Sequence, residues 1–240
     1  MKVFAKTNIG LVRPVNEDAY YAPGHGENFC AVADGMGGHS AGEVASAMAV
    51  VTFADVMHKD EMPAADAMRH AVERANADIF QRADTSVELR GMGTTFVGLC
   101  CVDKDVHIAH VGDSRAYLIR DQRITRVTTD HSLVESMVQE GLITEEEAKH
   151  HPKRNIITRA LGTHPSVEVD MIRMDKKPGD VYLLCTDGLS EYVDDQTMLE
   201  ITCADASWEN KLNQLIDLAL DGGGADNITA LYAIFEEDQK

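Results

Sequence analysis

The sequence predicts an α+β fold built from layers of helices and antiparallel strands. Blocks of short apolar strands, joined by tight turns, alternate along the chain with pairs of long amphipathic helices. A doubly wound parallel sheet would instead alternate single strands with single helices. The chain has 240 residues, of which 44% are hydrophobic, so one full core can be buried. We therefore expect one compact domain of α+β type.

The first half of the chain begins with strands expected at 3–7 and 28–33, the second of which is apolar on both faces. A helix then follows from Ser40, which forms a capping-box pattern with Glu43. Its expected buried face carries three apolar residues: Val44, Met48 and Val51. A second helix begins near Pro63 and repeats apolar residues at helical spacing: Ala64, Met68, Ala71, Val72, Ala75 and Ile79.

The second half begins with strands expected at 94–102, 106–111 and 116–119, which form antiparallel hairpins. From about residue 131 to 162 short helical pieces and loops replace this pattern, which indicates an insertion that lies over the surface. The remaining expected elements are strands at 167–174 and 181–185, helices at 195–201 and 207–220, and a strand at 228–235.

The chain is strongly acidic, with 22 Lys and Arg residues against 40 Asp and Glu residues and a net charge of −18. This charge argues against nucleic acid and anionic membranes as partners, because like charges repel. No stretch approaches the roughly 20 apolar residues of a membrane span. The amino terminus lacks a signal-peptide core, so we expect a soluble, cytoplasmic protein. Five cysteines without a Cys-x-x-Cys pair indicate buried thiols rather than disulfides or a zinc site.

Five aspartates stand at the ends of expected strands: Asp18, Asp34, Asp113, Asp187 and Asp226. Each one alone is typical of a turn. Strand ends in a sandwich of two sheets often meet at one rim, so the five can share a cleft. Crowded carboxylates repel by roughly 4 kcal/mol per pair at 4 Å, and divalent cations relieve that repulsion. Oxygen ligands without His or Cys suit Mg²⁺ or Mn²⁺.

The chain resembles the metal-dependent type-2C serine/threonine protein phosphatases in their compact bacterial form. Eight segments stand in the family's order and cover the chain from residue 10 to 229: GLVRPVNED from Gly10, ADGMGGH from Ala33, GMGTT from Gly91, GDSR from Gly112, TDHS from Thr129, TRALG from Thr158, CTDGL from Cys185 and GADNIT from Gly224. The resemblance implies a four-layer α-β-β-α sandwich of two mainly antiparallel sheets flanked by helix pairs. It also implies a single catalytic domain over 1–240 with a flap at about 131–162.

The resemblance also implies a two-metal centre that holds Mn²⁺ or Mg²⁺. By match, Asp34 bridges both metals, the Gly35 carbonyl binds one of them, and Asp187 and Asp226 hold the other. A hydroxide between the two metals then attacks phosphorus in line. The further implied ligands and water-orienting groups are Asp18 and Glu17 for metal-bound waters and Asp113 for a third, weaker metal.

Two further residues match substrate contacts of the family. Arg13 matches the arginine that grips the substrate phosphate through two oxygens; a lone arginine is otherwise a surface charge. His39 lies three residues beyond the place where larger relatives carry a proposed general acid, and Met36 occupies that place. His39 is therefore either a catalytic or substrate contact, or a cap of the following helix.

The expected function is hydrolysis of phosphoserine and phosphothreonine in signalling proteins, which reverses a bacterial Ser/Thr kinase. We expect a monomer. Two alternatives stay open: a phosphoprotein-binding pseudophosphatase on the same fold, and a phosphatase that acts on small phosphorylated molecules. The presence of Asp34, Asp187 and Asp226 favours the enzyme over a pseudophosphatase, because inactive members usually lack metal aspartates.

Overall fold

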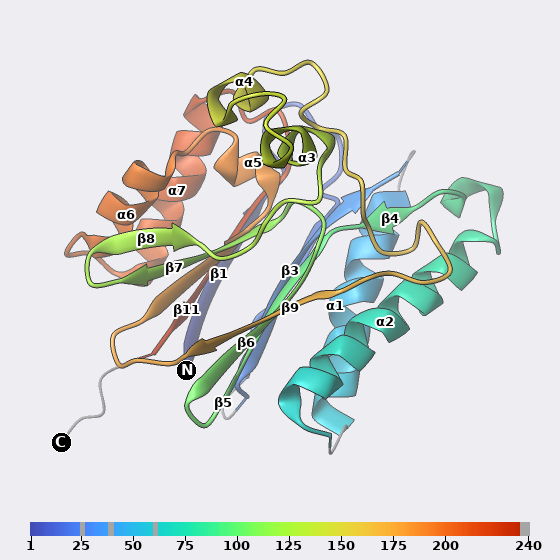
Figure 1. The fold of residues 1–240 in the computed structure, drawn as a ribbon, viewed down its shortest axis with the longest axis horizontal. Helices are drawn as coiled ribbons and strands as arrows, with labels where there is room; N and C mark the ends of the chain where they lie inside the picture. The colour runs from blue at the N-terminus through green and yellow to red at the C-terminus, as the bar shows by residue number, and fades with distance from the viewer. Residues whose placement is uncertain (25–26, 38–40, 60–61, 236–240) are drawn as a thin grey trace.

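The computed structural model describes residues 1–24, 27–37, 41–59 and 62–235. Two stacked antiparallel sheets form the centre, and helices cover both outer faces (Figure 1). This four-layer α-β-β-α arrangement confirms the expected fold class.

The first sheet contains the two ends of the described chain as neighbouring strands. Lys2 lies opposite Ile234, so the two strands pair over their full length. The strand order is β1 (Lys2–Asn8), β11 (Ile228–Ile234), β10 (Val181–Cys185), β7 (Arg115–Arg120) and β8 (Arg123–Arg126).

The second sheet is built mainly from the first half of the chain. Its strand order is β2 (Asp18–Tyr21), β3 (Phe29–Met36), β5 (Phe96–Val102), β6 (Asp105–Val111) and β9 (Asp170–Asp175), and the short β4 (Gly93–Thr94) also pairs with β3. Side chains of β3 alternate between two cores. Ala31 and Ala33 face the helices, whereas Cys30 and Val32 face the other sheet. This explains why β3 is apolar on both faces.

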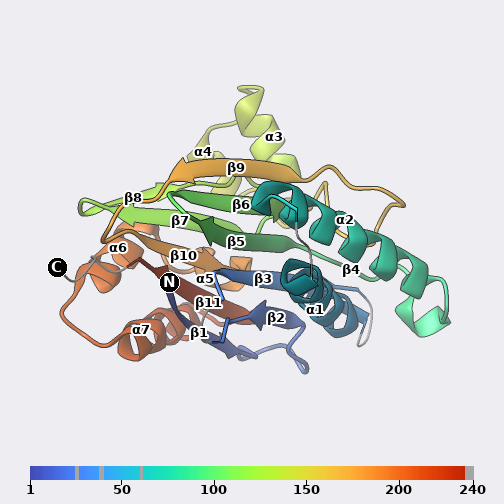
Figure 2. The same cartoon turned by 90° about the horizontal axis from the view of Figure 1, so that it is seen from below.

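Helices α1 (Ala41–Lys59) and α2 (Ala64–Ala83) cover the second sheet, as Figure 2 shows from below. The first sheet is covered by α5 (Asp187–Ser190), α6 (Asp195–Cys203) and α7 (Trp208–Asp221). A single 3-10 turn, η1 (Val87–Leu89), follows α2. None of the helices in these ranges is both long and apolar enough to cross a lipid bilayer.

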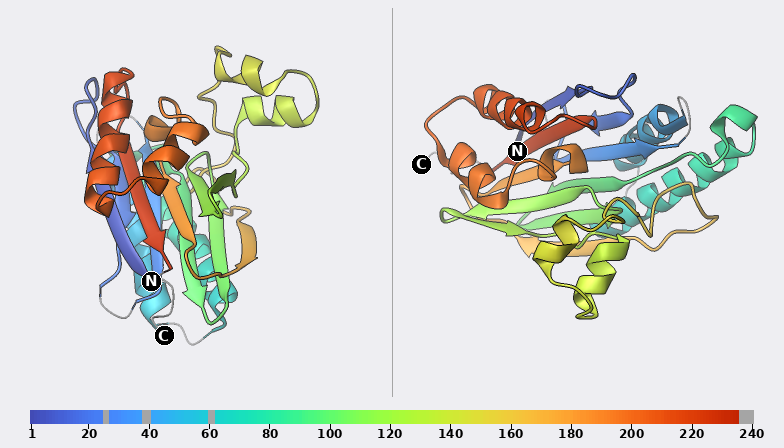
Figure 3. Two further views of the ribbon diagram at one scale, coloured as in Figure 1. Left: turned by 90° about the vertical axis from the view of Figure 1, so that its left-hand side faces the viewer. Right: turned by 90° about the horizontal axis from the view of Figure 1, so that it is seen from above.

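The segment 131–162 contains α3 (Leu133–Gln139) and α4 (Glu145–Lys149), which stand out from the sandwich (Figure 3). Its two ends meet, because Thr158 N–H donates to the His131 carbonyl at 2.8 Å and Ser132 pairs with Ile157. This geometry agrees with an insertion. Its role as a flap, and the assignment of 1–240 to one catalytic domain, stay predictions.

Several local expectations differ from the structure. Val51 is 60% exposed, because α1 turns its small residues Ala45 and Ala49 toward the closely packed sheet. The expected strand at 94–102 breaks at Thr95, whose N–H donates to the Asp34 carbonyl instead of continuing the ladder. The strand expected at 167–174 begins only at Asp170.

Two expectations on single residues also have different outcomes. Cys203 is exposed, whereas the other four cysteines are buried as expected. The capping box at Ser40 lies outside the described residues.

Candidate active site

The five strand-end aspartates come together at one rim of the sandwich, and we call them the acidic cluster: Asp18, Asp34, Asp113, Asp187 and Asp226. Asp18 on β2 lies opposite Asp34 on β3 in the sheet register. Burial, and then the charges of the other four carboxylates, raise the pKa of Asp34 well above its usual range. Five separate elements therefore direct negative charge into one small space.

Several oxygens of this site are inaccessible to solvent and have no hydrogen-bond partner among the described residues: Glu17 Oε1, Asp18 Oδ1, Asp113 Oδ1 and Asp187 Oδ1. Burial raises the pKa of Asp18 to about 7, of Asp187 to about 6 and of Asp113 to about 8. Asp226 and Glu191 add to the increase at Asp187, while contact with the Asp34 carboxyl opposes it. Ordinary buried carboxylates find donors, so these oxygens are arranged for a cation rather than for the protein's own groups.

Asp18 is positioned by two threonines, Thr229 in β11 of the other sheet and Thr186 at the N-cap of α5. Its Oδ2 accepts hydrogen bonds from Thr186 Oγ1 at 2.9 Å and from Thr229 Oγ1 at 2.7 Å. Thr186 Oγ1 also accepts from Thr229 N–H at 3.0 Å. One carboxylate oxygen is therefore fixed, and the other is left directed into the acidic cluster.

Asp34 is positioned through its backbone. Its carbonyl accepts from Thr94 Oγ1 at 2.8 Å and from Thr95 N–H at 2.9 Å, and its own N–H donates to Thr95 Oγ1 at 3.0 Å. The next residue must be glycine, because a Cβ on Gly35 would lie 2.1 Å from the Gly42 carbonyl oxygen. The start of α1 is thereby pressed against the end of β3.

The loop before β2 is held by Asn227. Its Oδ1 accepts from Glu17 N–H at 2.7 Å, and its Nδ2 donates to the carbonyls of Ile9 and Val15 at 2.8 and 3.0 Å. The loop that carries Arg13 and Glu17 is thus fixed beside Asp226. Burial raises the pKa of Glu17, and Arg13 opposes this effect.

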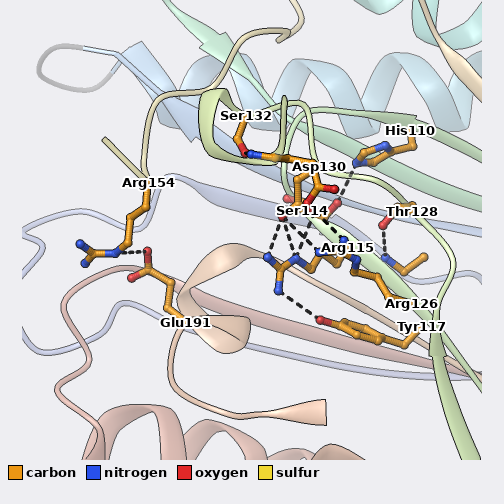
Figure 4. Close-up of polar contacts among 12 residues, drawn as sticks. His110, Ser114, Arg115, Tyr117, Arg126, Thr128, Asp130, Ser132, Arg154 and Glu191 are labelled. Atoms are coloured by element: carbon orange, nitrogen blue, oxygen red, sulfur yellow. Dashed lines mark hydrogen bonds and ion pairs between the residues drawn. The ribbon is translucent and has the colours of Figure 1, made fainter. Parts of the chain in front are cut away.

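Asp113 lies in the turn between β6 and β7. Gly112 has a φ of +107°, and a Cβ there would lie 2.6 Å from Thr95 Cβ, so only glycine fits. Ser114 Oγ and Thr95 Oγ1 are hydrogen-bonded at 2.7 Å. Behind the turn, Arg115 grips the carboxylate of Asp130 with two nitrogens, as Figure 4 shows.

Arg13 borders the acidic cluster. Its Nη2 donates to Asp226 Oδ2 at 2.7 Å, and this contact raises the pKa of Arg13. About half of the Arg13 side chain (47%) is exposed, so the guanidinium lies at the mouth of the site. His39, the other expected substrate contact, lies outside the described residues.

Sequence reasoning thus named the residues that the structure brings together: Asp18, Asp34, Gly35, Asp113, Asp187, Asp226, Glu17 and Arg13. It did not identify the groups that position them, which are Thr186, Thr229 and Asn227. Their signal was present, because each stands next to or within three residues of a cluster aspartate in the quoted motifs. It also missed the ion pair between Arg154 Nε of the 131–162 segment and Glu191 Oε1 at 3.6 Å (Figure 4).

The sequence profile described as Protein phosphatase 2C matches residues 13–219 of this chain. The chain belongs to the protein phosphatase 2C family. The match begins at Arg13 and includes four members of the acidic cluster, with Asp226 just beyond its end.

Individual phosphatases of this family are similar over nearly the whole chain. The serine/threonine protein phosphatase PstP of Mycobacterium tuberculosis is 42% identical over 97% of this chain, which spans 45% of the length of PstP. The serine/threonine phosphatase stp of Listeria monocytogenes is 37% identical, with 98% of this chain and 96% of stp covered.

A solved structure of the PstP catalytic domain in complex with two manganese ions has a TM-score of 0.89 to this chain. The two are 38% identical, and 98% of each chain is covered. The type-2C phosphatase resemblance and the α+β sandwich are both confirmed by these relationships.

Proposed function

We propose that this protein hydrolyses phosphoserine and phosphothreonine residues of other proteins. The observation that carries the proposal is the acidic cluster with its unpartnered carboxylate oxygens, beside an arginine at the mouth of the site. The named Ser/Thr phosphatases that share the family and most of the chain support the same activity.

The residues of the cluster fit divalent cations. Their free atoms are hard carboxylate oxygens, and three of them have no hydrogen-bond partner among the described residues: Asp18 Oδ1, Asp113 Oδ1 and Asp187 Oδ1. Neither a histidine nor a thiol is among the five members, so Mn²⁺ or Mg²⁺ suits the site better than zinc. We propose two such cations per chain, with a third bound more weakly.

Asp34, Asp187 and Asp226 would hold the two cations, together with the Gly35 carbonyl, and Asp113 would hold the third. Bound there, divalent cations supply Lewis-acid neutralisation of phosphoryl charge and lower the pKa of water. Asp18 would accept hydrogen bonds from water molecules in the site and thereby orient them, since Thr186 and Thr229 fix its other oxygen. Glu17 would take the same role from the adjacent loop.

Arg13 would bind the substrate phosphate. Its guanidinium is already directed toward the cluster, and two parallel N–H groups match two phosphoryl oxygens. His39 would contact the substrate or donate a proton to the leaving serine or threonine oxygen.

We further propose that residues 1–240 act as one catalytic domain whose 131–162 segment borders the site as a flap. The Arg154–Glu191 ion pair supports this placement, because Glu191 also acts on the charge of Asp187. The substrates would be phosphoproteins made by a Ser/Thr kinase, and the protein would act as a monomer.

The test is hydrolysis of a phosphothreonine peptide by the chelated protein, before and after Mn²⁺ or Mg²⁺ is added back. We expect turnover only with a divalent cation. Full turnover after exhaustive chelation would overturn the metal centre. Tight binding of the peptide without turnover would favour a pseudophosphatase, and hydrolysis of small phosphate esters alone would favour a small-molecule phosphatase.

A further inference from the structure

Two histidines outside the acidic cluster, His110 and His131, contact the backbone on the two sides of Asp113. The ring of His110 packs against the ring of His131 with their centroids 4.8 Å apart. His110 Nε2 lies 2.9 Å from the Ser114 carbonyl oxygen, on one side of Asp113 (Figure 4). On the other side, Gly112 N–H donates to His131 Nδ1 at 3.0 Å, and His131 N–H donates to the Gly112 carbonyl at 2.7 Å.

The far side of the His131 ring faces two charged residues. His131 Nε2 lies 3.3 Å from Asp170 Oδ2, at the start of β9. Arg159 Nη1 lies 2.9 Å from the same nitrogen and donates to Asp170 Oδ1 at 2.7 Å. Arg159 and His131 stand at the two ends of the 131–162 segment, so this group ties the base of that segment to the Asp113 turn.

His110, His131 and Asp170 place ligand atoms within 4.8 Å of one another, which is also the pattern of a metal site. Two contacts argue against that reading. The Gly112 N–H uses the His131 Nδ1 lone pair, and Arg159 Nη1 lies 2.9 Å from Nε2, so protein groups already contact both ring nitrogens. The Arg159 guanidinium already supplies the cation beside Asp170.

The Gly112 contact selects one tautomer of His131. Because Nδ1 accepts from Gly112, the proton of the neutral ring is on Nε2, and Asp170 Oδ2 is the acceptor within reach. Arg159 Nη1 lies 2.9 Å from the same nitrogen, and because a guanidinium only donates, this contact is not a hydrogen bond in that tautomer. Burial lowers the pKa of His131, which keeps the ring neutral and leaves Nδ1 free to accept. Asp170 thus orients His131, and His131 holds the backbone of the turn.

We infer that His131 is a positioning residue for the weakly bound third cation: it holds the Gly112–Asp113 turn so that the Asp113 carboxylate is directed into the acidic cluster. The inference rests on the proposed role of Asp113. Asp113 has an unpartnered Oδ1, and its backbone neighbours on both sides are held by the histidines. Groups that orient ligands in this way typically change metal affinity by about 10- to 100-fold.

A matched pair of variants separates the two nitrogens of His131. In His131→Asn the side-chain oxygen replaces Nδ1 and can still accept from Gly112. In His131→Gln the amide replaces Nε2, so it can reach Asp170 but leaves Gly112 without an acceptor. Hydrogen exchange of the Gly112 amide, followed by NMR, is expected to stay slow in the Asn variant and to become fast in the Gln variant.

Metal titration then tests the consequence. Calorimetry is expected to show the two tight Mn²⁺ sites in both variants. In His131→Gln the Mn²⁺ concentration for half-maximal binding at the weak site, and for half-maximal turnover, is expected to rise about tenfold or more. His131→Asn is expected to stay near wild type. The inference would be overturned if wild type and both variants showed the same dependence of binding and turnover on Mn²⁺ concentration. It would also be overturned if Gly112 exchanged fast in His131→Gln while that dependence stayed unchanged.

A second pair keeps the test decisive if His131→Gln does not fold. Asp170→Asn retains an acceptor for His131 Nε2–H, whereas Asp170→Leu removes it. The ¹⁵N imidazole signals of His131 are expected to show the single Nε2–H tautomer in wild type and Asp170→Asn, and a mixture in Asp170→Leu. A mixture already in wild type would overturn the inference. If the wild-type protein showed no metal-dependent turnover, that result would instead contradict the proposed function.

Discussion

Two groups of aspartates in this molecule differ in what neutralises them. Asp130 and Asp180 are only 8% and 1% exposed, and each is gripped by an arginine: Arg115 holds Asp130 and Arg120 holds Asp180 through two contacts. Asp18, Asp113 and Asp187 have no such partner, and each keeps a buried oxygen without a donor. The first group is complete within the protein. The second group has no cationic side chain among the described residues to neutralise it, and this difference separates structural aspartates from the candidate active site.

The largest expected effect comes from the unpartnered group. Asp187→Asn should lower turnover of a phosphothreonine peptide by several orders of magnitude, because a cation loses a carboxylate ligand. The metal-free variant should melt no lower than metal-free wild type, since removal of one charge relieves repulsion within the acidic cluster. Steady-state kinetics and thermal melting with a chelator check both results. If Asp187→Asn lost much stability but kept normal turnover, Asp187 would behave like the arginine-paired aspartates, and the two groups would not differ in function.

The arginine-paired group should respond in the opposite way. Asp180→Ala removes the carboxylate partner of Arg120 and leaves its guanidinium only the Asp175 carbonyl among the described residues, so the free energy of unfolding should fall by about 3 kcal/mol. Turnover per folded molecule should stay unchanged, because the pair lies far along the strands from the acidic cluster, at the start of β10. Urea denaturation and an active-fraction assay measure the two quantities. Arg120→Ala is the matched variant and should give a loss of similar size.

Arg13 sharpens the comparison, because it is an arginine beside the unpartnered group. Arg13→Ala should raise KM for the phosphopeptide by about 10- to 100-fold, as expected for loss of charge-assisted hydrogen bonds to phosphate. Arg13→Lys should rescue only part of this effect. The Mn²⁺ affinity measured by calorimetry should not fall, because Arg13 is a cation that donates to Asp226 and is not itself a metal ligand. If both kinetic constants are unchanged, Arg13 is a surface charge.

The last expected effect is a slope rather than a single change: the stability of the metal-free protein depends on pH. In the fold the pKa of Asp113 is raised to about 8 from its ordinary 3.8, so between those values the folded chain binds a proton that the unfolded chain releases. Stability of the metal-free protein should therefore fall as pH rises from 5 to 8, by at most about 1.4 kcal/mol per pH unit from this group. Asp113→Asn should flatten that slope, as should saturating Mn²⁺ in wild type. Identical slopes for wild type and variant, measured by urea denaturation with a chelator, would contradict this expectation.

The sequence by itself determined the layered fold and the membership of the acidic cluster. Hydrophobic periodicity distinguished helices from strands, and β3 was recognised as doubly buried because Cys30, Ala31, Val32 and Ala33 are all apolar. The aspartates could be grouped because each one stands at or near one end of a strand, and strand ends of a sandwich meet at a rim. Hydrophobic periodicity and the position of a residue at the end of a strand depend only on nearby residues in the chain, so both can be read from the sequence.

Only the tertiary structure decided which aspartates have partners. Asp113 and Asp130 each follow a strand by a few residues, yet Arg115 folds back onto Asp130 and leaves Asp113 Oδ1 without a partner among the described residues. The same holds for Thr229, which reaches Asp18 across 211 residues of chain. Pairing across such distances is set by sheet register and by the packing of one sheet on the other. Because a side chain's charge balance depends on these long-range contacts, motifs alone could name the acidic cluster but not the contacts that position its members, such as those of Thr186 and Thr229 with Asp18.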